Sequence, residues 1–240
     1  MDKSFILSAL RHGTLRLEGQ FMYGSNYTFM VVSQYEGQRF EAVYKPTQGE
    51  RPLWDFPDQT LSRREVAAYL VSEGLGWGLV PPTVYRIKKS PMGPGSVQLF
   101  IAHNPEYHYF NLSKKDREHL PKVMAFDFII NNADRKGGHL LIDPDDKLWL
   151  IDHGLSFHVE EKIRTVVWDH AGEPIPGDCL KEVTAFLERL SPGCTLYRDL
   201  RTHLLEEEMQ ALKSRAKQLA DSGTFPLPPE DRRAYPWPLI

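Results

Sequence analysis

Four charged residues occur in an order that could bind a nucleoside triphosphate. Lys45 stands in EAVYKP, Glu65 in RREVAAYL, Asp134 in NNADRKGGH and Asp152 in LIDHGLSF. Phosphoryl transfer needs a cation on the phosphates, oxygen ligands for a divalent metal and a carboxylate near the acceptor hydroxyl. We expect Lys45 to reach the phosphates with Glu65 as its partner. Asp134 would orient and deprotonate the acceptor, and Asp152 would hold the metal across the β and γ phosphates.

Each of these residues also has an ordinary structural interpretation. Lys45 and Glu65 could be unrelated exposed residues, Asp134 could end a helix, and Asp152 could stand in a turn. The two aspartates, however, flank the segment HLLIDPDDKLWLI, and the lysine and glutamate precede them in the required order. This combination favours the functional interpretation.

The first hundred residues must supply the sheet and helix that position Lys45 and Glu65. Residues 14–44 contain three alternating apolar and polar runs separated by MYGSN and EGQ, which predicts a three-stranded antiparallel meander. In the first turn, backbone amides could bend over the phosphates, although any hairpin turn can contain such residues. The candidate residues within this turn are Gly24, Ser25 and Asn26.

A helix is predicted from Leu61, with Ser62 as its cap and Glu65 at the third position after it. Glycines at positions 74, 76 and 78 would end this helix. The segments TVYRI and SVQLFI predict two further strands. The first hundred residues are therefore expected to form a small sheet with one helix.

The second half of the chain is predicted to be mainly helical. Ser113 would cap a helix whose apolar stripe reaches Ile130, and HLLI and LWLI would form two short strands around the turn DPDDK. Two amphipathic helices are expected over residues 179–190 and 196–219. The segment from Phe225 contains five prolines and is expected to extend over the surface.

Five segments together resemble the phosphatidylinositol 3- and 4-kinase superfamily, most closely its small type II-like branch and the bacterial phosphatidylinositol kinase-related proteins. They are AVYKP, REVAAYLVSEGLGWGLVPPT, GSVQLFI, FDFIINNADR and LIDHGLSF, and the resemblance covers about residues 14–160. It implies an α+β, two-lobed, protein-kinase-like fold. Residues 1–102 would form the N-lobe, 103–224 the C-lobe and 225–240 a proline-rich tail.

The resemblance also implies that ATP is the cofactor and that its adenine lies against one strand between two apolar walls. The strand residues, whose backbone would bond the adenine, are Gln98, Leu99, Phe100 and Ile101, and the walls are Val43 and Ile151. Arg135 would lie beside the catalytic aspartate and fix its loop. The ordinary alternative for Arg135 is an exposed arginine.

One position departs from the family pattern. His139 stands five residues after the catalytic aspartate, where related kinases carry a metal-binding asparagine. Neutral imidazole suits softer ions better than Mg²⁺, which prefers oxygen ligands. We therefore expect either one metal held firmly by Asp152 or a preference for Mn²⁺ over Mg²⁺. The alternative is that His139 binds nothing and activity is low.

Composition restricts the partners. The 240 residues include 29 Lys and Arg against 32 Asp and Glu, a net charge of −3, which does not favour nucleic acid. No apolar run reaches the ~18 residues of a membrane span, and the first residues contain too short an apolar run for a secretory signal. We therefore expect no stable membrane insertion and a cytoplasmic protein.

The stretch between His153 and Asp178 bears on the acceptor. It contains two basic residues, Lys162 and Arg164, against several acidic ones. A pocket for an anionic inositol lipid would gather Lys and Arg. The expected activity is thus ATP-dependent phosphorylation of a hydroxyl on a protein or small polar molecule. A phosphatidylinositol lipid kinase and a nucleotide-binding regulatory pseudokinase are the alternatives.

Overall fold

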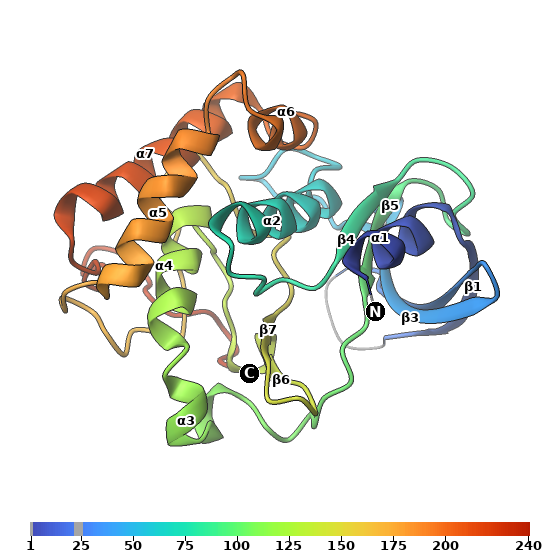
Figure 1. Ribbon diagram of the computed structural model, residues 1–240, viewed down its shortest axis with the longest axis horizontal. Coiled ribbons are helices and arrows are strands. Elements are labelled where there is room, and N and C mark those ends of the chain that lie inside the picture. Colours follow the sequence, from blue (N-terminus) through green and yellow to red (C-terminus); the bar gives the residue numbers. More distant parts are fainter. Residues whose placement is uncertain (1, 22–25) are drawn as a thin grey trace.

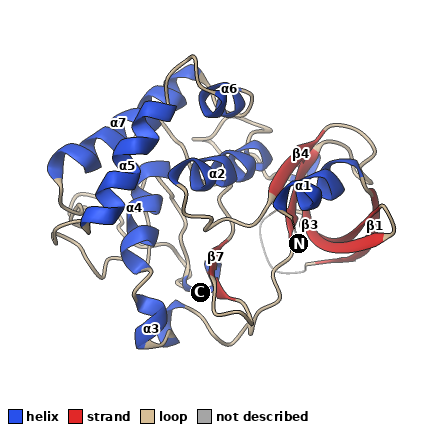
Figure 2. Cartoon of the chain, in the orientation of Figure 1, coloured by secondary structure: helices blue, strands red, loops and turns tan. Residues whose placement is uncertain are grey.

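The computed structural model describes residues 2–21 and 26–240 (Figures 1 and 2). Gly24 and Ser25 lie outside the described residues. The chain forms a five-stranded antiparallel sheet near its N-terminus and a larger helical part, and Figure 1 shows helix α2 between the two. The predicted α+β, two-lobed architecture is confirmed.

The sheet contains both the predicted meander and the two further strands. Its strands follow the order β1-β2-β3-β5-β4. Lys45 lies opposite Ser96 in the pairing of β3 with β5, so the strand that carries the lysine is central in the sheet. The strands are β1 (Thr14–Gln20), β2 (Phe29–Tyr35), β3 (Gln38–Pro46), β4 (Thr83–Arg86) and β5 (Gly95–Leu99).

Helix α1 (Lys3–His12) was not predicted from the sequence, and it packs on the sheet. The Arg86 guanidinium donates hydrogen bonds to the carbonyls of Leu10 (3.0 Å) and Gly13 (2.8 Å). A Cβ atom at position 13 would lie 2.2 Å from the Ser33 hydroxyl, so only glycine allows this close approach.

Helix α2 (Leu61–Leu75) ends as predicted at Gly76, which adopts the left-handed conformation with φ of 77°. Its start differs from the prediction, because Ser62 lies inside the helix. The Glu50 carboxylate caps the helix instead and accepts hydrogen bonds from the amides of Leu61 (3.0 Å) and Ser62 (2.8 Å). The capping role of Ser62 was therefore wrong.

The helix predicted to run from Ser113 to Ile130 is broken in two. Ser113 caps α3 (Lys114–Arg117), as expected, and α4 (Leu120–Ile130) starts afresh. Pro121 explains the break, since proline has no amide hydrogen and its ring clashes with the carbonyl four residues earlier.

The later elements follow a similar pattern. The predicted helix at 179–190 is present as α5, whereas the one at 196–219 is divided into α6 and α7. The division occurs where the Glu208 carboxylate accepts a hydrogen bond from the Leu205 amide (2.9 Å) and starts a new helix. These elements are β6 (Leu140–Ile142), β7 (Leu148–Leu150), α5 (Gly177–Arg189), α6 (Thr195–Arg201) and α7 (Glu206–Ser222). Short 3-10 turns occur at Thr47–Gly49, Tyr109–Asn111 and Gly137–His139.

The apolar residues form two cores. The smaller core joins the sheet to α1 through residues such as Leu10, Val31 and Val97. The larger core fills the helical part, and it includes Ala67 and Val71 of α2. Helix α2 therefore buries its apolar side chains with the helical part, although it lies within the first hundred residues.

Candidate active site

A cavity of about 410 Å³ lies between the sheet and the helical part. This volume is within the range of small-molecule sites. The predicted site residues that line it are Asn26, Val43, Lys45, Glu65, Gln98, Leu99, Phe100, Ile101, Asp134, His139, Ile151 and Asp152. The structure thus brings together residues that are far apart in the sequence.

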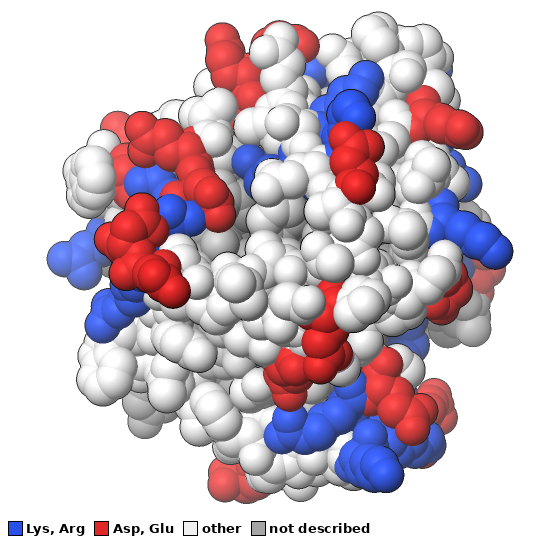
Figure 3. All heavy atoms as spheres, turned by 90° about the vertical axis from the view of Figure 1, so that its left-hand side faces the viewer, with Lys and Arg blue, Asp and Glu red and all other residues white. Residues whose placement is uncertain are grey.

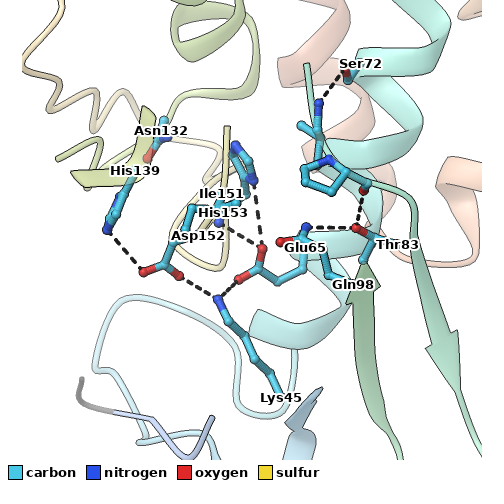
Figure 4. A network of polar contacts seen from close by, with 12 residues as sticks. Lys45, Glu65, Ser72, Thr83, Gln98, Asn132, His139, Ile151, Asp152 and His153 are labelled. Atoms are coloured by element: carbon cyan, nitrogen blue, oxygen red, sulfur yellow. Dashed lines mark hydrogen bonds and ion pairs between the residues drawn. The ribbon is translucent and has the colours of Figure 1, made fainter. Parts of the chain in front are cut away.

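Lys45 binds two carboxylates from different parts of the fold (Figure 4). Its Nζ lies 2.8 Å from Oδ1 of Asp152, which follows β7, and it also binds the carboxylate of Glu65 on α2. Burial lowers the pKa of Lys45, but the charges of Asp152 and Glu65 outweigh this effect and raise the pKa above its usual value. Lys45 therefore stays protonated and positively charged at neutral pH.

Asp152 has an unusual backbone for a residue with a side chain, with φ of 60°. Such left-handed residues are uncommon and concentrate at functional sites. The positive charge of Lys45 holds the pKa of Asp152 well below its usual range, although burial opposes it. The carboxylate is thus ionised at neutral pH, as a ligand for a hard cation must be.

Asp134 lies in the loop after α4 and lines the cavity. Its Oδ2 is 3.3 Å from the Lys136 ammonium, and its amide donates to the side-chain carbonyl of Asn132 (3.0 Å). Burial raises the pKa of Asp134, and the nearby negative charge of Asp152 raises it further. The positive charge of Lys136 opposes both effects. A raised pKa makes a carboxylate a better proton acceptor.

Arg135 does not line the cavity but is buried behind it, which excludes the exposed alternative. Its Nε donates to both carboxylate oxygens of Asp127 (3.0 and 3.1 Å), and its Nη1 donates to the carbonyl of Ile151 (2.9 Å). The guanidinium therefore ties the loop that carries Asp134 to the segment that carries Asp152.

His139 lies beside Asp152, with 3.5 Å between its Nε2 and Oδ2 of the aspartate. Burial lowers the pKa of His139 to about 4, so the imidazole is neutral at pH 7. Its Nδ1 accepts a hydrogen bond from the Lys136 amide (3.3 Å), which places the proton on Nε2. In this tautomer the ring offers Asp152 a donor rather than a lone pair for a metal.

Asp152 therefore has the oxygen atoms that a metal ion needs. The His139 ring, with its proton on Nε2, does not offer a free lone pair there. Among the described residues, no three His, Cys, Asp or Glu side chains gather as a ready-made metal cage. Mg²⁺ is commonly held by one or two carboxylates together with substrate phosphates. Asp152 suits that kind of binding.

The strand predicted to contact the adenine is partly engaged within the protein. The Leu99 amide donates a hydrogen bond to the backbone carbonyl of Pro82 (2.9 Å), and the Phe100 amide donates one to the backbone carbonyl of Glu41 (3.0 Å). Those two amides cannot serve a nucleotide. Within the described part of the chain, the Phe100 carbonyl and the Ile101 amide enter no such bond, so they are the groups left to face an adenine.

Two positioning residues were missed from the sequence. Asp127 occurs in FDFIINNADR, yet nothing in the pattern paired it with Arg135. The His153 amide donates to Oε2 of Glu65 (2.9 Å), and its ring Nε2 lies 2.8 Å from Arg135 Nη2. The only signal for His153 was its position beside Asp152.

Comparisons with known proteins show which family the chain resembles. The family model of phosphatidylinositol 3- and 4-kinases matches residues 59–218. Protein Rv2133c of Mycobacterium tuberculosis is 39% identical over 266 residues, covering 97% of this chain and 95% of its own length. Phosphatidylinositol 4-kinase gamma 4 of rice (Oryza sativa subsp. japonica) is 30% identical over 133 residues, which cover 46% of this chain and 23% of the rice protein.

Solved structures match in fold. The Golgi casein kinase with Mn/ADP bound has a TM-score of 0.56 at 15% identity, over 91% of this chain and 74% of its own. The hydra Fam20 structure with sugar has a TM-score of 0.54 at 14% identity, over 90% of this chain and 86% of its own. At these identities the likeness concerns the fold alone, which is kinase-like.

Proposed function

The chain belongs to the phosphatidylinositol 3- and 4-kinase family, and from this premise we propose that it is an ATP-dependent phosphotransferase. The acceptor would be a hydroxyl on a protein or a small polar molecule. The observation that supports this most is the convergence of Lys45, Asp134 and Asp152 on one cavity. Phosphoryl transfer is catalysed mainly by such placement of charge.

Each residue has a role in the proposal. Lys45 would bind the phosphates while Glu65 holds its ammonium in place. Asp152 would hold Mg²⁺ or Mn²⁺, whose charge neutralises the phosphate oxygens when the ion is bound. Asp134 would orient the acceptor hydroxyl and take its proton, and Arg135 would keep the loop of Asp134 in position.

The charges of the stretch between His153 and Asp178 favour a polar acceptor over an anionic lipid. Lys162 is already paired with Asp55 (2.9 Å), and both side chains are largely buried. Figure 3 shows the helical side of the molecule, where basic and acidic side chains are interspersed around an uncharged area. In the described residues, no helix is both long and apolar enough to cross a membrane. An anionic headgroup would need free cations, and the pair with Asp55 commits one of the two basic residues between His153 and Asp178.

Two other functions have an observation in their favour. Family membership favours a lipid kinase. The histidine at the asparagine position favours a regulatory module that binds nucleotide without transferring phosphate.

The test is label transfer from γ-labelled ATP, with Mg²⁺ or Mn²⁺, to the protein itself, to cell-extract protein and to phosphoinositide vesicles. Nucleotide binding is measured separately by thermal stabilisation. Asp134→Asn should bind nucleotide like the parent while transfer falls on the order of 10²-fold or more, because the acceptor-orienting carboxylate is lost. Lys45→Met should lose nucleotide affinity.

Each outcome separates the three functions. Transfer to vesicles alone would identify a lipid kinase, and stabilisation without any transfer would identify the regulatory module. Parental transfer in both variants would contradict the site assignment.

A further inference from the structure

Arg64 and Glu65 are neighbours on α2 that point to different surroundings. Glu65 faces the cavity, whereas Arg64 is 1% exposed and forms an ion pair with Glu208 of α7, which is 5% exposed. The Arg64 guanidinium also donates to the Ser156 carbonyl and lies 4.9 Å from the centre of the Phe56 ring. Three segments that are distant in sequence therefore meet on one guanidinium.

Glu208 is itself firmly placed. Its Oε2 accepts the hydrogen bond from the Leu205 amide that starts α7. The next residues of α7, including Met209 and Leu212, are buried in the larger core. The carboxylate that receives Arg64 is thus fixed by a helix start and by a core, not by a mobile loop.

Stability alone does not account for this pair. Removing two charges from water costs about as much as their attraction returns, so well-packed apolar residues would stabilise the fold equally well. Consecutive residues of an α-helix diverge by about 100° around its axis. Fixing Arg64 therefore also fixes the direction in which Glu65 points.

We propose that Arg64 and Glu208 form a positioning pair that sets the rotation of α2, so that Glu65 meets Lys45. This inference deepens the proposed function and rests on it, because the contact that it maintains is the one that would prepare the phosphate-binding lysine. Neither residue lines the cavity, and their effect on the nucleotide passes through Glu65.

Other contacts keep α2 attached when the pair is lost. Nη1 of Arg63 donates to the Thr202 carbonyl (2.9 Å), and Nη1 of Arg189 donates to the Gly74 carbonyl (3.0 Å). Loss of the pair should therefore loosen the orientation of α2 without detaching the helix.

The first test is Glu208→Gln, with Glu207→Gln as its control. Glu207 lies in the same first turn of α7 but is exposed. Two quantities are measured: the dissociation constant of Mn-ATP and hydrogen exchange of the amides of residues 61–75 without nucleotide. Glu208→Gln should weaken nucleotide binding at least tenfold and speed exchange in α2, and Glu207→Gln should change neither. Parental exchange in Glu208→Gln would overturn the proposal.

A second variant separates positioning from stability. Arg64→Met combined with Glu208→Leu removes both charges and leaves no unpaired ion. The melting temperature of this double variant should be close to that of the parent, whereas its nucleotide affinity should be at least tenfold weaker than the parent's. Parental affinity in the double variant would show that the pair serves stability only. If the parent itself binds no nucleotide, the proposed function fails, and the exchange data still decide whether the pair orders α2.

Discussion

The hydrogen-bonding state of one imidazole decides what position 139 contributes to the site. Nδ1 of His139 accepts the Lys136 amide, so Nε2 carries the proton toward Asp152. To bind a metal through Nε2, the ring would have to move its proton and lose the Lys136 bond. In the proposed function, Asp152 would then be the metal-binding side chain of this pair, in line with the single-metal expectation from the sequence.

Restoring the family residue should change the metal preference. We expect His139→Asn to raise nucleotide affinity in Mg²⁺ relative to Mn²⁺ on the order of tenfold, because an amide oxygen suits Mg²⁺ better than imidazole does. The measurement is nucleotide titration in each metal. His139→Ala is the matched control, and it should bind like the parent in both metals. A selective loss of Mn²⁺-supported binding in His139→Ala would instead make the imidazole a ligand.

Side chains with recognisable motifs were placed correctly from sequence, whereas their supports were not. Lys45, Glu65, Asp134 and Asp152 line one cavity because each stands in a motif with a fixed place in the element order. Their roles stay predictions. Asp127 could not be found, because a carboxylate within an apolar helix stripe has no sequence signal that names its distant partners.

At the scale of elements, α4 holds the loop that carries Asp134 through a buried carboxylate. Asp127 accepts hydrogen bonds from Arg135, from the Asn132 side chain (3.0 Å) and from the Thr165 hydroxyl (3.0 Å). Asp127 and Arg135 have no exposed side-chain surface. The helix end and the loop after it are therefore joined by a buried network of hydrogen bonds.

Breaking this network should destabilise the whole fold. Asp127→Asn leaves the Arg135 charge buried without a counter-charge, which costs about 3–5 kcal/mol. Urea unfolding measures this loss as a lower midpoint with an unchanged slope. Asp145→Asn, an exposed change in the β6–β7 turn, should stay within about 0.5 kcal/mol of the parent. A loss of less than about 1 kcal/mol in Asp127→Asn would contradict the network's role.

Elements with strict patterning were predictable, and elements that depend on distant partners were not. Alternation located the three strands of the meander, the segments TVYRI and SVQLFI located the other two strands of the sheet, and Gly76 located the end of α2. The start of α2 was missed because its cap, Glu50, comes from another segment. The division between α6 and α7 similarly depends on Glu208, which looks like any other acidic residue in EEEM.

The whole molecule contains one buried and two partly buried histidines that link its stability to pH. Burial lowers the pKa of His139 and of His203 to about 4, and it lowers that of His153 well below 6.5. Below pH 6.5 these histidines therefore bind protons in the unfolded chain but stay neutral in the folded protein. Stability is fully present above that pH and is lost as the pH falls toward the folded pKa values.

We expect the free energy of unfolding to fall steeply between pH 6.5 and 5, by up to about 1.4 kcal/mol per pH unit for each histidine. Glu65 and Asp134, whose pKa values burial raises, work in the opposite direction at the acidic end. Urea unfolding at stepped pH measures the slope. His203→Phe, which lies outside the cavity, should reduce it by about one proton. A flat profile in the parent would contradict these pKa directions.

The ion pairs of Lys45 with Glu65 and Asp152 give these charged groups partners within the protein when no ligand is bound. In the ligand-free protein, the Lys45 ammonium of β3 binds the Glu65 carboxylate of α2 and the Asp152 carboxylate that follows β7, and so it connects the sheet to the rest of the molecule (Figure 4). In the proposed function, a metal-nucleotide would enter by exchange: Asp152 would give up the lysine for the metal, and Lys45 would give up Asp152 for phosphate. Each charged group would keep a partner of opposite charge during this exchange, so the proposed loading would not require the sheet and the helical part to move apart.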